Sequence, residues 1–126
     1  GIDQVCLAGA AAERWQNALS SATCVIDAIL GTGATGAAKG DTEVAIESIL
    51  RRMETNPRPK IISIDVPSGF DCDRGAPCGA CVCADETLTF VASKEGFKTS
   101  DAEHYTGRIH VLDIGVPQVV RNRFGL

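Results

Sequence analysis

Aromatic residues are scarce in this chain of 126 residues, which has one tryptophan, one tyrosine and four phenylalanines. Long apolar runs are also missing, because none approaches the roughly 18 residues that a membrane-spanning helix requires. Basic residues form no cluster longer than Arg51-Arg52, and none alternates with aromatic residues. The sequence therefore predicts neither a membrane protein nor a dedicated nucleic-acid-binding protein.

The remaining composition is that of a globular protein. Hydrophobic residues make up 44% of the chain and charged residues 22%, and the formal net charge is −4. This length and these proportions fit one domain with a modest core. We expect a cytoplasmic protein, or a mitochondrial one if the source is eukaryotic.

Six cysteines are present, and three of them form a C-x2-C-x-C cluster at Cys78, Cys81 and Cys83. We expect reduced thiols, since two of the six lie in apolar, strand-like segments. The cluster fits either a metal site or small residues in a loop that enters a strand. The loop is the simpler interpretation, because no fourth ligand lies at zinc-finger spacing.

The most informative stretch runs from Cys24 to Gly36, with the sequence CVIDAILGTGATG. Residues 24–30 are apolar except for Asp27, and Gly31, Gly33 and Gly36 follow. A short apolar run that ends in glycines predicts a parallel strand, buried on both faces, that leads into a ligand loop. A buried carboxylate in such a strand requires a partner.

A second strand is predicted at 60–66, where IISIDVPSG places Asp65 at the end of an apolar run. The helix predicted at 42–55 lies between the two strands, with Asp41 or Thr42 as its cap. This order is a βαβ unit, which implies parallel strands. Other expected elements are a helix at 10–20 with Trp15 as a core anchor, strands at 86–91 and 108–114, and a loop at 92–106.

Loops that follow parallel strands meet at one edge of the sheet, so Asp27, Asp65 and the glycine loop should share a site. The amides of residues 31–37 can form a nest for an anion such as a diphosphate. The glycines match G-x-G-x-x-G spacing, but the acid expected about 20 residues later is not evident. The alternative to a ligand site is that the glycines form only a tight turn and that Asp27 and Asp65 are structural acids.

Six motifs together carry a family resemblance: VIDAILGTG, the G-x-x-x-G at 36–40, IDVPSGFD, TLTF, SKEG and DIGVP. In this order and approximate spacing across residues 24–117, the chain resembles the NAD(P)H-hydrate epimerase family, also called the YjeF N-terminal domain family. The resemblance implies a Rossmann-like α/β/α sandwich with a mostly parallel sheet. It also implies an isomerase of nicotinamide-nucleotide repair that interconverts the R and S forms of hydrated NADH or NADPH.

The same resemblance implies roles for individual residues. Asp27 and Ser68 would bind a potassium ion, and Asp27 would also assist proton transfer as the catalytic residue. The implied substrate-binding residues are Gly31, Thr32, Gly33, Ala34, Thr35, Gly36, Ala37 and Asp65. A homodimer and a functionally linked dehydratase are the implied partners.

Two departures from the family pattern bear on completeness. No segment matches the family's N-N-G-G-D-G motif, and Ser93 stands where a proline is expected. We therefore expect residues 1–126 to be the C-terminal part of a single domain, with an incomplete sandwich and a large exposed apolar surface. A non-catalytic nucleotide-binding or dimerisation module and a generic sugar-phosphate-binding domain are the alternatives, and retention of Asp27, Asp65 and Ser68 favours the enzyme.

Overall fold

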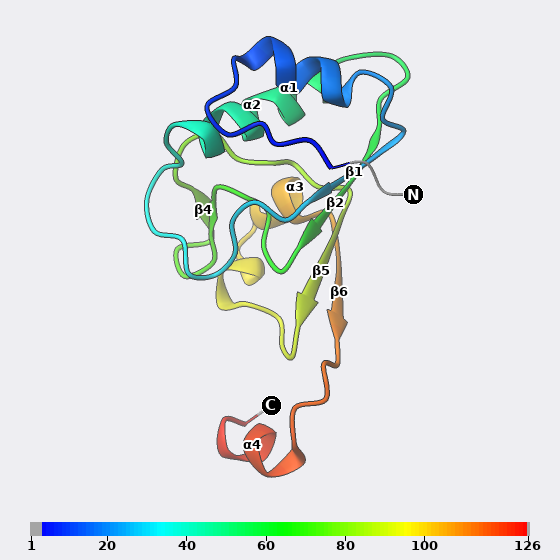
Figure 1. Cartoon of the computed structure of the whole chain (residues 1–126). Coiled ribbons are helices and arrows are strands. Elements are labelled where there is room, and N and C mark those ends of the chain that lie inside the picture. The colour runs from blue at the N-terminus through cyan, green and yellow to red at the C-terminus, as the bar shows by residue number, and fades with distance from the viewer. Residues whose placement is uncertain (1–3, 126) are drawn as a thin grey trace.

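Four parallel strands form the main sheet of the computed structural model, which describes residues 4–125 (Figure 1). They are β1 (Cys24–Asp27), β2 (Lys60–Ile64), β5 (Glu86–Phe90) and β6 (Arg108–Leu112), and they are paired in that order. All three pairings are parallel. The predicted βαβ unit and the two later strands are confirmed, and the arrangement is a Rossmann-like α/β fold.

Helices and a hairpin lie between the strands of the sheet and at the two ends of the chain. The helices are α1 (Ala12–Leu19), α2 (Asp41–Met53), α3 (Ala102–Thr106), α4 (Gln118–Arg123) and the 3-10 helix η1 (Glu95–Lys98). The hairpin consists of β3 (Phe70–Asp71) and β4 (Ala76–Pro77). The prediction of a plain loop at 92–106 is wrong, because Phe97 and Ala102 are buried in a cluster with Phe70 and hold η1 and α3 in place.

Helix α2 covers one face of the sheet. Ile46 and Ile49 are buried against Val25 and Ile61 of the strands, as their helical spacing predicts. On the outer side, Arg51 pairs with Glu47 at 3.2 Å, also as expected. The predicted side-chain cap is wrong, because the Asp41 carboxylate instead accepts a hydrogen bond from the amide of Gly9.

Helix α1 lies against α2 at the end of the molecule that is blue in Figure 1. The Arg52 guanidinium on α2 donates hydrogen bonds to the carbonyl oxygens of Leu19 and Ala22, which fixes the end of α1. Trp15 is only half-buried, and no residue of α1 is fully buried. The prediction that Trp15 anchors the core is therefore wrong, since α1 packs on the outside of another helix.

Strand β1 differs from its prediction in length and in burial. It ends at Asp27 instead of residue 30, because the Asp27 carboxylate accepts the amide of Ile29 and the chain bends there. It is also an edge strand, with Val25 and Asp27 buried but Cys24 and Ile26 exposed. The expectation of burial on both faces is wrong, because no described helix lies on the Ile26 side.

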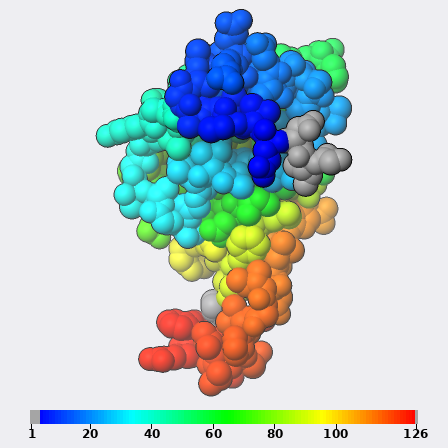
Figure 2. Space-filling model, viewed as in Figure 1, coloured from blue at the N-terminus to red at the C-terminus, as the bar shows by residue number. Residues whose placement is uncertain are grey.

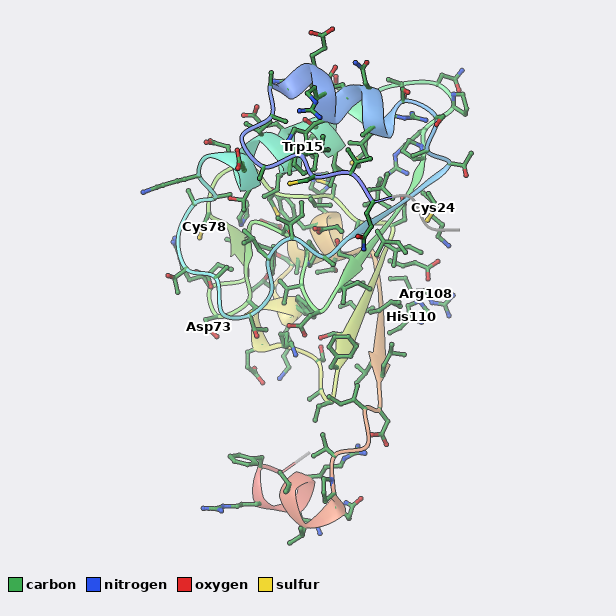
Figure 3. All side chains as sticks on the ribbon, in the orientation of Figure 1. Trp15, Cys24, Asp73, Cys78, Arg108 and His110 are labelled. Atoms are coloured by element: carbon green, nitrogen blue, oxygen red, sulfur yellow. The ribbon has the colours of Figure 1, made fainter. Side chains whose placement is uncertain are left out.

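We call the uncovered side of the sheet the open face. Its large apolar side chains include Ile26, which is 65% exposed, and Leu112, which is 40% exposed. Near the start of the strands, the Lys60 ammonium donates to the Glu86 carboxylate at 2.5 Å, and the Nε2 atom of His110 lies 2.9 Å from the same carboxylate. Cys24, Arg108 and His110 all project on this side, away from the helices (Figure 3). The described residues thus form two layers of the sandwich, and the expected exposed apolar surface is confirmed.

The chain after β6 leads away from the sheet to α4, which projects from the rest of the molecule (Figures 1 and 2). Val119 and Phe124 are exposed there. Among residues 4–125, no helix has both the length and the apolar character needed to cross a membrane.

Candidate functional site

Asp27 is the centre of the polar groups at the carboxyl edge of the sheet. Its side chain is fully buried, and it accepts hydrogen bonds from the Ser63 hydroxyl at 2.8 Å and from the Ser68 hydroxyl at 2.5 Å. The Ser68 amide donates a further bond at 2.8 Å. The carboxylate has the partners that its burial requires, and it joins β1 to the Pro67-Ser68-Gly69 turn after β2.

The glycine loop begins beside this centre. The Leu30 amide donates to the Ser68 hydroxyl oxygen at 2.9 Å, so Ser68 connects Asp27 with the first residues of the loop. Within the loop, the Ala34 amide donates to the Gly31 carbonyl in a tight turn. Residues 31–37 are otherwise exposed, and their backbone lies open at the edge of the sheet.

Asp65 lies on the other side of the loop, directly after β2. Its carboxylate approaches Gly31 so closely that a Cβ at that glycine would meet it at 3.4 Å, and it accepts from the Thr32 amide at 3.5 Å. The Lys94 ammonium lies 3.0 Å from the same carboxylate. The backbone of Asp65 has φ 68°, a left-handed value that non-glycine residues adopt infrequently and mostly at turns or constrained sites.

A small depression opens between the glycine loop and the β3–β4 hairpin. Its lining consists of Leu30, Gly31, Ala34, Gly36, Pro67, Gly69, Phe70, Asp71 and Cys78. The amide of Arg74 above all, helped by the Asp73 amide and the Cys78 thiol, holds the pKa of Asp71 below its usual range against the effect of burial. Asp71 therefore adds a carboxylate to the wall that faces the glycine loop.

The thiols of Cys78, Cys81 and Cys83 do not point to one common point where a metal ion could bind. Cys78 donates its thiol hydrogen to Asp71 at 3.6 Å, whereas Cys83 lies 3.9 Å from the Nε2 atom of His104. Cys81 is buried, and burial raises the pKa of its thiol to about 12. In the part of the chain that the structure describes, no group of three or more His, Cys, Asp or Glu side chains is placed to hold a metal ion, and all six cysteines are free.

The predicted site residues are brought together, although they do not all line one cavity. Asp27, Ser68, Asp65 and the glycine loop meet at one edge of the sheet. Gly31, Ala34 and Gly36 line the depression, whereas Thr32, Gly33 and Thr35 face solvent and Ala37 lies against Gly79. Asp27 lies beneath the surface of this edge.

Sequence reasoning overlooked Lys94, Ser63 and Asp71 as parts of this edge. Lys94 lies in the segment that follows β5, and segments that follow parallel strands meet at one edge of the sheet, so its place in the sequence was a signal for it. Ser63 alternates with the apolar residues of β2 and faces Asp27. Asp71 closes the IDVPSGFD motif, but the sequence predicts only a turn residue there, because it gives no indication of the β3–β4 hairpin.

Comparison with known proteins gives the family. The family model described as "YjeF-related protein N-terminus" matches residues 5–96. An NAD(P)H-hydrate epimerase of Pirellula staleyi is 37% identical over 109 residues, which cover 86% of this chain and 46% of that protein. The NAD(P)H-hydrate epimerase of Levilactobacillus brevis is 39% identical over 100 residues, covering 79% of this chain and 44% of that protein.

A third relative, the bifunctional NAD(P)H-hydrate repair enzyme Nnr of Escherichia coli, is 35% identical over 96 residues, or 76% of this chain and 18% of that protein. The chain thus spans less than half the length of each of these relatives. The matched region contains β1, the glycine loop, Asp65, Ser68 and Lys94. The chain belongs to the family of YjeF-related protein N-termini.

Proposed function

We propose that the protein containing this chain interconverts the R and S epimers of hydrated NADH or NADPH. The observation that carries the proposal is the convergence of Asp27, Ser68, Asp65 and an open glycine loop at the carboxyl edge of a parallel sheet. The names of the relatives, NAD(P)H-hydrate epimerases and repair enzymes, support the same reaction.

In this proposal, the exposed amides of residues 31–37 bind the diphosphate of the substrate. Glycines allow the loop backbone to approach an anion without interference from Cβ atoms, and residues 31–37 are exposed at the edge of the sheet. Asp65 accepts a hydrogen bond from the substrate, since its carboxylate lies beside the first loop residues.

A potassium ion is proposed as the cofactor, held by the Asp27 carboxylate and the Ser68 hydroxyl. Both ligands are oxygen atoms, which suit a hard cation, and they already lie in contact. When bound, the ion would offset the charge of Asp27 beside an anionic substrate. The complete burial of Asp27 argues against direct proton transfer to the substrate, because a group that transfers a proton must reach the reacting atom.

A linked dehydratase is proposed as the functional partner, because an epimerase alone does not remove the added water, and relatives named bifunctional combine two activities. A homodimer and a cytoplasmic or mitochondrial location stay predictions. Light scattering of the purified protein tests the first, and fluorescent tagging in the source cell tests the second.

The decisive assay follows conversion of the R epimer of hydrated NADPH by the full-length protein, with and without potassium. We expect turnover that potassium increases. Asp27→Ala should lower the rate by more than about 100-fold, and Asp65→Ala should mainly weaken substrate binding by about 1–3 kcal/mol. Binding of hydrated NADPH without turnover would contradict the epimerase and favour a non-catalytic nucleotide-binding module.

A further inference from the structure

The carboxyl edge of the sheet holds an excess of negative charge for a site that binds an anion. Asp27, Asp65 and Asp71 all lie beside the glycine loop or the depression next to it. A carboxylate near a bound diphosphate repels it unless a cation compensates, and the repulsion is strong where the site is partly buried. The site therefore requires positive charge besides the loop amides.

Lys94 supplies that charge at Asp65. Its ammonium lies 3.0 Å from the Asp65 carboxylate, and both side chains are largely shielded, at 22% and 20% exposure. Two ion pairs of residues 4–125 have their carboxylate directly after a strand of the sheet, and Lys94–Asp65 is the one whose carboxylate contacts the glycine loop, whereas Arg121–Asp113 follows β6. Water screens such a pair less than an exposed one. A charged ligand beside the pair is therefore strongly affected by whether Lys94 neutralises the Asp65 carboxylate.

The backbone is arranged to bring these two residues together. Asp65 directly follows β2 and Val91 directly follows β5, and each has φ 68°. A left-handed conformation is unfavourable for a β-branched residue such as Val91, so the surrounding structure must hold it. The sharp turn at Val91 directs the chain back across the end of the sheet, which places Lys94 beside the loop after the neighbouring strand.

The Lys94 ammonium is only partly engaged. It has three N–H donors, and in the described residues it approaches two acceptors, the Asp65 carboxylate and the Phe90 carbonyl oxygen at 3.3 Å. One N–H is thus left for a ligand at the glycine loop.

We propose that Lys94 is a positioning residue of this site, which neutralises Asp65 and so permits an anionic nucleotide to bind beside it, while its remaining N–H donates to that anion. The inference rests on the proposed function for the identity of the nucleotide, and on the contacts above for the role of Lys94. In this proposal Asp65 has two roles, because it orients the Lys94 ammonium and accepts a hydrogen bond from the substrate.

The test compares KM and kcat for hydrated NADPH in the full-length wild-type protein, Lys94→Met, Lys94→Arg, Asp65→Asn and the double variant Lys94→Met/Asp65→Asn. Lys94→Met leaves an uncompensated carboxylate, so KM should rise about 10- to 100-fold while kcat stays near the wild-type value. Lys94→Arg should retain most of the affinity. The double variant should recover a large part of the loss, because it removes the charge that Lys94 neutralised.

Lys98→Met is the matched control. Lys98 belongs to η1, just beyond Lys94, and pairs with the exposed Glu95 at 2.7 Å, away from the glycine loop. The KM of Lys98→Met for hydrated NADPH should equal that of the wild type. Thermal denaturation of every variant shows whether it is folded, and a purely structural role of Lys94 would lower the melting temperature without any rescue by Asp65→Asn.

A wild-type KM in folded Lys94→Met, or losses that add in the double variant, would overturn the proposal. Calorimetric titration with ADP separates it from the proposed function. If the wild type lacks epimerase turnover but binds ADP more tightly than Lys94→Met, the epimerase is wrong and the role of Lys94 stands. If the wild type turns over hydrated NADPH but Lys94→Met binds ADP as tightly as the wild type, the epimerase stands and the role of Lys94 is wrong. Absence of both turnover and ADP binding would overturn both.

Discussion

The Ser68 hydroxyl donates a 2.5 Å hydrogen bond to the Asp27 carboxylate, which connects residues 41 positions apart in the sequence. Ser68 also accepts the Leu30 amide, so one side chain joins the end of β1, the turn after β2 and the start of the glycine loop. The acid and the loop are therefore parts of one hydrogen-bonded unit, whichever ligand they bind.

We expect Asp27→Ala to destabilise the fold by about 2–5 kcal/mol, because it leaves the buried donors of Ser63 and Ser68 without an acceptor. Urea denaturation at neutral pH measures the change. Asp73→Ala, at an exposed turn, is the control and should change stability by less than about 0.5 kcal/mol. Equal stability of the two variants would mean that Asp27 is not a structural centre.

Gly69 and Gly36 are glycines for different reasons, since only at Gly69 would a side chain clash with the neighbouring backbone. Both have positive φ, but a Cβ at Gly69 would meet the Ala80 carbonyl oxygen at 2.1 Å, whereas a Cβ at Gly36 would meet nothing within 4 Å. Gly36→Ala should cost about 1–2 kcal/mol, which is the backbone strain alone. Gly69→Ala should cost several kcal/mol more or prevent folding, as measured by denaturation or soluble yield. Comparable losses would show that the turn at Gly69 can move.

The two faces of the sheet should respond differently to truncation. Ile61 on β2 is fully buried and Ile26 on β1 is 65% exposed. In the 126-residue chain we expect Ile61→Ala to cost about 2–5 kcal/mol and Ile26→Ala less than about 0.5 kcal/mol. Ile26→Ala should also reduce binding of a hydrophobic dye to the open face. A large loss of stability for Ile26→Ala would indicate that the open face is covered in solution.

Because of Cys81, the free energy of unfolding should depend on pH in the alkaline range. Burial raises the pKa of its thiol to about 12, from a usual value of 9.0. The unfolded chain loses this proton at lower pH than the folded one, so the contribution is complete below about pH 9 and declines as pH rises toward 12. The stability difference between the wild type and Cys81→Ala should therefore shrink between pH 8 and about pH 11. Cys6→Ala, at an exposed position, provides the reference. A difference that is constant over this range would contradict the burial of the thiol.

Local sequence patterns determined the β1–α2–β2 unit and the later strands. Apolar residues at helical spacing give α2 its buried face at Ile46 and Ile49. Short apolar runs give β1 and β2, and alternation of apolar residues with threonines gives β5. The gathering of Asp27, Asp65 and the glycine loop followed from the same patterns, because consecutive parallel strands send their following loops to one edge.

Tertiary structure alone decided which sides of these elements are covered and which side chains pair. Ile26 looks like a core residue in the sequence, but β1 is an edge strand with an open face. The burial of Phe97 and Ala102 against Phe70 orders η1 and α3, whose sequence looks like a polar loop. The contacts of Asp27 with Ser63, and of Asp65 with Lys94, join residues on different strands or loops. No periodicity encodes such contacts, because they depend on the register and twist of neighbouring strands and on the path of the loops between them.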